Sequence, residues 1–264
     1  MKRPPRIPWP AWSLVALAAA SCGESVEKGL DPFSKPSPSI AFAYEGRTLE
    51  QWASHVSDKD PVSRRDAAFA LGAFGSDASD VVGSLVPLLR DEDADLRWTA
   101  LVAIERIGVA PPAVADGVVV ALSDPQTSVR GAAHAAVARL GTVLVDALVK
   151  RLAVDDWDAQ TTAAETLGSM GAAAVPALTK VLSDVRGDTA ALAARALASM
   201  GAAAAPAIPD LVKCLRRQGT VRLSAIEALA AIGSASRPAL EAALHDPDER
   251  VQSAAQVALD RLPR

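Results

Sequence analysis

A repeated pattern of apolar and polar positions runs through most of this chain. Eight residues before each end point of the pattern stands an alanine, and four residues before it stands a Leu, Ile or Val. Apolar positions spaced three and four apart are typical of helices with one buried face, and their recurrence every 30 to 33 residues indicates a helical solenoid. The end points are Gly75, Gly108, Gly141, Gly171, Gly201, Gly233 and Pro263, and the alanines are Ala67, Ala100, Ala133, Ala163, Ala193, Ala225 and Ala255.

Each repeat is predicted to consist of two helices joined by a short turn. The glycine is predicted to end the second helix in the left-handed conformation, which glycine adopts without the steric penalty of a β-carbon. We therefore expect an all-α fold, a right-handed α–α superhelix of about seven helix pairs over residues 44–264. Because aspartate caps helices and proline suits their first turn, second helices are predicted to start at Asp60-Pro61, Asp93, Asp124-Pro125, Asp155-Asp156 and Asp246-Pro247.

Prolines are concentrated in the segments predicted as first helices. Pro87 follows Leu85 inside an apparent helix and is predicted to kink or delay it. The later ones are predicted to lie in first turns, where a missing N–H costs little: Pro176, Pro206, Pro209 and Pro238.

The spacing resembles the HEAT-repeat family, particularly its short bacterial form, the PBS-lyase HEAT-like repeat. The best copy reads Asp124-Pro125…Val129-Arg130…Ala133…Val137…Leu140-Gly141. The resemblance extends over about residues 44–264 and implies a fold, but the motif encodes packing and implies little about activity.

The resemblance also implies a ladder of aspartate and arginine between neighbouring repeats. Asp91 with Arg97, and Asp124 with Arg130, stand at matching positions of successive repeats and are interpreted as structural. Later repeats depart from this pattern, so the ladder is predicted to end after the third repeat and to permit a change of superhelical twist there. The departures are Gln160, Ala190 and Gln252 in place of arginine, and Arg216 in place of aspartate.

The first 43 residues differ from the repeats. A positively charged start and an apolar run predict a signal peptide over residues 1–21, and the Pro- and Ser-rich residues 22–43 predict a flexible tether. The segment 17–22, Leu-Ala-Ala-Ala-Ser-Cys, resembles a bacterial lipoprotein signal, which implies cleavage before Cys22 and its lipidation. A plain secretory signal cleaved near Ala20 is the alternative. We expect export and a lipid anchor, with the solenoid at the periplasmic face of a bacterial membrane or at the cell surface.

Composition offers little material for catalysis. The 264 residues carry a net charge of −4 and no basic block, which argues against nucleic acid as a partner. The chain has three histidines, and none precedes a glutamate as in the paired motifs of the di-iron hydroxylases built from such repeats. Cys214 is interpreted as a small apolar core residue. We expect no enzyme activity, no catalytic or metal-binding residue, no cofactor and no small-molecule substrate.

The remaining candidate for function is the outer face of the second helices. Positions one and five residues after the arginine position are predicted to face outward and to bind another protein. The alternative for the two aromatic residues is packing against the preceding helix. The main hypothesis is a scaffold or adaptor for an unknown protein; the alternatives are an accessory subunit of a lyase-like enzyme and a self-associating envelope component. The predicted binding residues are Arg65, Phe69, Trp98, Val102, Glu165, Arg195 and Glu227.

Overall fold

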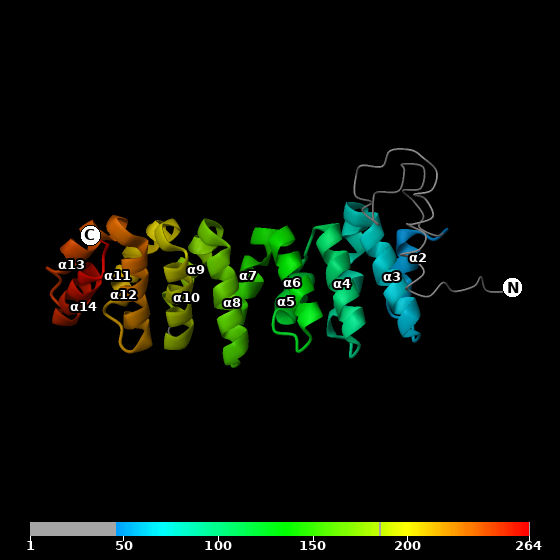
Figure 1. Cartoon of the computed structure of the whole chain (residues 1–264), viewed down its shortest axis with the longest axis horizontal. Coiled ribbons are helices and arrows are strands. Elements are labelled where there is room, and N and C mark those ends of the chain that lie inside the picture. The colour runs from blue at the N-terminus through cyan, green and yellow to red at the C-terminus, as the bar shows by residue number, and fades with distance from the viewer. Residues whose placement is uncertain (1–45, 185, 264) are drawn as a thin grey trace, which may run out of the picture. The chain divides into compact units, whose positions relative to one another are not determined.

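The computed structural model describes residues 46–184 and 186–263. Every regular element in these residues is a helix, and successive helix pairs follow one another in chain order (Figure 1). The predicted all-α fold of stacked helix pairs is therefore confirmed. The predicted signal peptide, the lipidated Cys22 and the tether over residues 22–43 lie outside the described residues.

The described residues form seven helix pairs, each with a first and a second helix. Several first helices open with a 3₁₀ turn, labelled η. The pairs are α2 (Leu49–His55) with α3 (Pro61–Phe74); η4 (Gly75–Arg90) with α4 (Ala94–Ile107); α5 (Pro112–Ala121) with α6 (Thr127–Leu140); η5 (Gly141–Leu144) and α7 (Val145–Arg151) with α8 (Trp157–Ser169); η6 (Gly171–Ala174) and α9 (Val175–Val181) with α10 (Gly187–Ser199); η7 (Gly201–Ala207) and α11 (Ile208–Cys214) with α12 (Thr220–Ile232); and η8 (Gly233–Ser236) and α13 (Arg237–Ala243) with α14 (Glu249–Asp260).

The recurring alanines form the centre of the core. All seven are buried, with at most 1% of their surface exposed. A small side chain at this position allows helices to approach closely, and glycines carry the approach further. A β-carbon on Gly72 of α3 would lie 2.9 Å from the Cα of Ala103 on α4. The alanine and glycine content of the sequence is thus explained by helix–helix stacking.

Aspartates start several second helices, though not all of those predicted. Asp60 and Asp93 are N-caps, as predicted, and accept hydrogen bonds from the backbone N–H groups of Val62 and Asp95. The predicted starts at Asp124 and Asp246 are wrong. The helices begin later, and Asp124 Oδ1 instead accepts from the N–H of Gln126, the residue that caps α6. In α14 the cap is Asp248, whose own N–H is bound by Asp246.

The repeat glycines adopt positive φ, but mostly outside the predicted left-handed helical region. Gly108 has φ 77° and ψ 15°, which is left-handed helical. Gly75 and Gly141 have φ 58° and 55° with ψ −133° and −127°, the mirror image of extended backbone. Only glycine enters this region readily. The difference arises because a 3₁₀ turn starts at these glycines, so the chain must reverse within one residue.

The prolines of the first helices lie either inside 3₁₀ helices or in the first turns of α-helices. Pro87 was predicted to kink an α-helix, but the whole of η4 is a 16-residue 3₁₀ helix. Pro206 lies within η7 instead of in a first α-helical turn. Pro176, Pro209 and Pro238 do lie in first turns.

One stretch of the described residues, Thr127–Arg151, is long and apolar enough to cross a membrane by length and composition. Gly141 splits it into α6, η5 and α7. Its buried apolar residues, among them Val129 and Leu148, belong to the solenoid core, whereas Val143 is exposed.

Candidate protein-binding face

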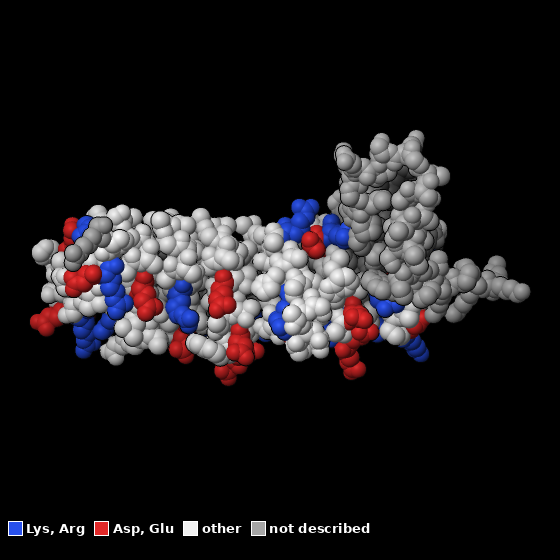
Figure 2. All heavy atoms as spheres, viewed as in Figure 1, with Lys and Arg blue, Asp and Glu red and all other residues white. Residues whose placement is uncertain are grey.

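Three of the four charged residues of the predicted binding face lie on consecutive second helices. Glu165 is on α8, Arg195 on α10 and Glu227 on α12, each exposed and each five residues after the arginine position. These helices pack side by side. In Figure 2, isolated acidic and basic side chains alternate along this part of the solenoid over a largely uncharged surface. We call Glu165, Arg195 and Glu227 the charge row.

A groove separates the first two members of the charge row. It has a volume of about 370 Å³ and lies between α8 and α10. At its floor α8 and α10 approach closely, which is possible because Gly168 has no side chain: a β-carbon there would lie 2.2 Å from the Ser199 Oγ. The Thr161 hydroxyl in its wall is buried without a hydrogen-bond partner among the described residues. The groove thus combines an acid, a base, an unpaired hydroxyl and apolar wall from Leu192.

The predicted apolar end of the face is less open. Arg65, Phe69, Trp98 and Val102 are half-buried, and Trp98 and Val102 pack against the core. For Trp98 this agrees with the alternative that it contributes to packing.

Six large apolar side chains are exposed among the described residues, and none of them is among the predicted binding residues. Trp157 and Leu223 expose 61% and 59% of their surfaces. Leu223 directly follows Arg222, at the position equivalent to Trp98, so the repeat register contained that signal. Trp157 begins α8 and belongs to no repeated apolar position.

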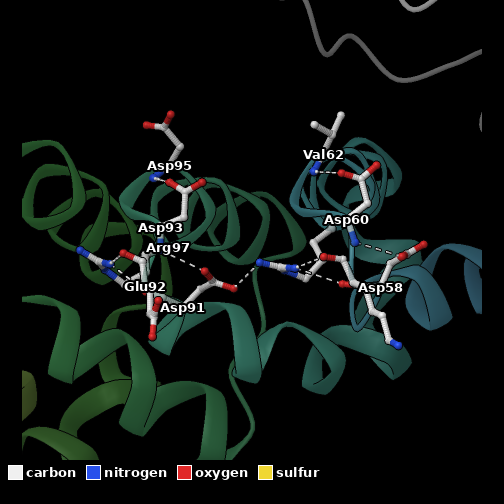
Figure 3. Close-up of polar contacts among 10 residues, drawn as sticks. Asp58, Asp60, Val62, Asp91, Glu92, Asp93, Asp95 and Arg97 are labelled. Carbon is white, nitrogen blue, oxygen red and sulfur yellow. Dashed lines mark hydrogen bonds and ion pairs between the residues drawn. The ribbon is translucent and has the colours of Figure 1, made fainter.

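The arginine–aspartate ladder connects the first three helix pairs. Arg64 Nη2 lies 3.0 Å from Asp91 Oδ2. Arg97 donates through Nε and Nη2 to both carboxylate oxygens of Asp124, at 2.7 and 3.0 Å. Its Nη1 donates to the backbone carbonyls of Asp91 and Glu92 (Figure 3). Within a repeat, the Arg97 side chain therefore binds the backbone carbonyl of Asp91. The ion pairs between side chains join neighbouring repeats, as Arg64 with Asp91 and Arg97 with Asp124.

Burial and pairing act in opposite directions on Asp124. Its loss of solvent raises the pKa of the carboxyl, but hydrogen bonds from Arg97 and from the Gln126 N–H lower it, and the net pKa lies below the usual value. The same hydrogen bond raises the pKa of Arg97. Both groups are thus held in their charged forms, which indicates a structural pair.

The ladder has no rung beyond Arg130 in the next repeat. Arg130 Nη1 donates to the carbonyls of Asp124 and Pro125 in its own loop. The residue equivalent to Asp91 in the fourth pair is Val154, whose carbonyl accepts from Gln160 Nε2 at 2.7 Å. A salt bridge between repeats reappears at Arg216 and Asp246. Asp246 stands at the aspartate position of the seventh pair, whereas Arg216 stands at the aspartate position of the sixth pair.

The side chains that could bind a metal ion or act as a nucleophile are separated from one another among the described residues. No group of three or more His, Cys, Asp or Glu in residues 46–184 and 186–263 is arranged to hold a metal ion. Cys214 is buried, and burial raises the pKa of its thiol, with its Sγ 3.7 Å from the Leu182 carbonyl. A protonated, buried thiol is unreactive.

Comparison with known families decides the classification. A family model for HEAT repeats matches residues 48–138 and 175–260. The chain belongs to the HEAT-repeat family. A second model, the PBS lyase HEAT-like repeat, matches residues 159–184, which contain most of α8 and all of α9. No curated protein matches the chain.

Solved structures with related HEAT or armadillo architecture resemble the chain only distantly. The CpcE–CpcF complex of phycocyanin lyase from Nostoc sp. PCC7120 is 26% identical, with coverage of 83% of this chain and 89% of that chain and a TM-score of 0.37. Human deoxyhypusine hydroxylase is 25% identical, covering 81% and 83%, with a TM-score of 0.36. A computationally designed armadillo repeat protein for modular peptide recognition is 20% identical, covering 81% and 100%, with a TM-score of 0.37. With such TM-scores, these likenesses support no inference about what this HEAT-repeat chain binds.

Proposed function

We propose that this HEAT-repeat chain is a non-catalytic scaffold that binds a segment of another protein along its second helices. The charge row carries this proposal. Three exposed acidic and basic side chains occupy one repeat position on three adjacent helices, next to a groove with an unpaired hydroxyl. A surface of this kind supplies charge complementarity and polar contacts without requiring any chemistry.

The spacing of the charge row indicates the partner's chemistry. Packed helices lie about 8–10 Å apart. A segment in the polyproline II conformation advances about 3.1 Å per residue and places every third side chain on the same face, so one helix spacing corresponds to about three residues of such a segment. Since the row reads acid, base, acid, a complementary segment carries Lys or Arg, then Asp or Glu, then Lys or Arg, each three residues apart.

Reversing the charge row tests this surface. In the variant Glu165→Lys, Arg195→Glu, Glu227→Lys, each attraction becomes a repulsion of similar size. We expect binding of a peptide with the Lys-x-x-Glu-x-x-Lys pattern to weaken by about 10- to 100-fold, mainly through slower association. Fluorescence anisotropy at two salt concentrations measures this. The matched control is Lys150→Glu, Asp116→Lys, an exposed pair on the first helices, and it should leave binding unchanged.

We propose further that the scaffold is exported and anchored by a lipid on Cys22. The sequence over residues 1–22 supports this, and the Pro- and Ser-rich residues 23–43 supply a tether. Intact-mass analysis of the protein from native membranes should give an acylated N-terminus at Cys22. The Cys22→Ala variant should lose the acyl chains and leave the membrane fraction. An unmodified chain beginning at Met1 would contradict the anchor but not the binding face.

An accessory subunit of a lyase-like enzyme is the second candidate. The observation in its favour is the match of residues 159–184 to the PBS lyase HEAT-like repeat. Co-purification with an enzyme whose activity requires this chain would favour it over the scaffold.

A further inference from the structure

The second helices pack directly on one another along the solenoid, except at one junction. The pairs α3–α4, α4–α6, α8–α10, α10–α12 and α12–α14 all have direct interfaces. In the described part of the chain, α6 and α8 have no comparable interface. In a solenoid, stability is a sum of the repeats and of the interfaces between neighbours, so a missing interface weakens that junction specifically.

Polar contacts are weakest at the same junction. At every other junction an arginine side chain crosses to the next or the preceding helix pair. Between the third and fourth pairs, the salt bridge among the described residues joins Lys150 to Asp116 at 3.7 Å, with 66% and 45% of the side chains exposed. An exposed pair of this kind contributes little to stability. The crossing arginine contacts elsewhere are Arg64–Asp91, Arg97–Asp124, Arg186–Ala153 O, Arg217–Asp184 O and Arg216–Asp246.

Of the four exposed residues on the face of α6 toward this junction, three are small. On α8, the equivalent face buries Ala164 and Gly168 against α10. On α6 the corresponding residues His134 and Ala138 are exposed, as are Gly131 and Ala135. A β-carbon on Gly131 would meet no described atom within 4 Å. The α6 face is therefore suited to close helix packing and is open in this structure.

The first helices, in contrast, are continuous across the junction. Helix α5 packs on η5 and α7. The residues available for this contact are fully buried: Val118 on α5, and Leu144, Leu148 and Leu152 on the other side. One layer of the solenoid is thus joined by an apolar interface, and the opposite layer is open.

From this arrangement we propose that the junction between the third and fourth helix pairs is a hinge. The α5–α7 interface is the pivot, and α6 and α8 move toward or away from each other. Val154 is the cause on the polar side, because it stands where the ladder requires an aspartate. The Arg130 guanidinium donates its hydrogen bonds within its own repeat, to the carbonyls of Asp124 and Pro125 and to the Thr127 hydroxyl. The hinge divides the solenoid into a half from α2 to α6 and a half from α7 to α14 that carries the charge row. Its opening changes the direction in which the charge row faces.

Distance distributions between two spin labels test the hinge directly. Cysteines replace Ala138 and Arg195, on α6 and α10, in the full chain with Cys22→Ser and Cys214→Ala. The control pair replaces Glu165 and Glu227, on α8 and α12, which likewise have one second helix between them. We expect the distribution across the junction to be at least about twofold wider than that of the control pair, as a hinge between rigid bodies requires.

Restoring the missing rung should close the hinge. Val154→Asp provides a carboxylate for Arg130 and should narrow the distribution to the width of the control pair. Val154→Asn, of the same shape without the charge, should leave it wide. Equal widths for the two label pairs in the parent protein would overturn the hinge, and so would a wide distribution in a folded Val154→Asp variant. The comparison in the parent protein stands even if Val154→Asp fails to fold.

Discussion

Replacing Arg97 with alanine should lower the free energy of unfolding by about 2–3 kcal/mol, because a partly buried carboxylate and two backbone carbonyls lose a charged hydrogen-bond donor. Its side chain is 12% exposed and that of Asp124 is 8% exposed. The substitution leaves the Asp124 carboxylate without its bidentate partner and the carbonyls of Asp91 and Glu92 without their donor. Urea unfolding followed by circular dichroism measures the effect.

Arg216→Ala is the matched control, because Arg216 also pairs with an aspartate of the next repeat but is 55% exposed. It should cost less than about 1 kcal/mol. Similar losses for the two variants would contradict the structural role of the ladder.

The same pair predicts how stability depends on pH. The folded pKa of Asp124 is lowered below its unfolded value of about 3.9, so its contribution is complete above that pH and is lost as pH falls through the folded pKa. Asp124→Asn should therefore reduce the loss of stability below about pH 4.

Replacing Gly72 with valine should destabilise the protein by about 2–3 kcal/mol, since new side-chain atoms would overlap a neighbouring helix. The nearest atom to an added β-carbon is the Cα of Ala103, at 2.9 Å, and a backbone atom cannot rotate away. The α3–α4 interface would have to separate. Thermal unfolding followed by circular dichroism measures the change.

Gly131→Ala is the matched control for helix glycines. Gly131 lies inside α6 with open space around its Cα, so alanine should stabilise the helix by about 0.5–1 kcal/mol. Destabilisation by both substitutions would show that helix backbone effects, rather than close packing, determine the result.

Much of this fold is predictable from the sequence because each repeat solves the same packing problem. The alanine position is buried in all seven pairs, and the ladder's end could be anticipated from Gln160 and the absence of an aspartate at Val154. These features are local and recur, so the register alone identifies them.

Other features depend on geometry that no single residue type encodes. The ψ angles near −130° at Gly75 and Gly141 follow from the 3₁₀ turn after them, and that turn is set by tertiary packing. Whether α6 packs on α8 depends on all the residues of both helix faces, so no single position predicts their separation. Likewise, Trp98 and Leu223 occupy the same repeat position, but Trp98 packs against the core and is half-buried whereas Leu223 is exposed.

The most direct test of the binding face is an exchange of charges on both sides. Two peptides, with the patterns Lys-x-x-Glu-x-x-Lys and Glu-x-x-Lys-x-x-Glu, are titrated against the parent protein and against the variant with all three charges of the row reversed. Peptides of the same composition with adjacent charges control for net charge. We predict that each protein prefers its complementary peptide by about 10-fold or more. The account would be contradicted if both proteins preferred the same peptide. It would also be contradicted if the control peptides bound as tightly as the patterned peptides of the same composition.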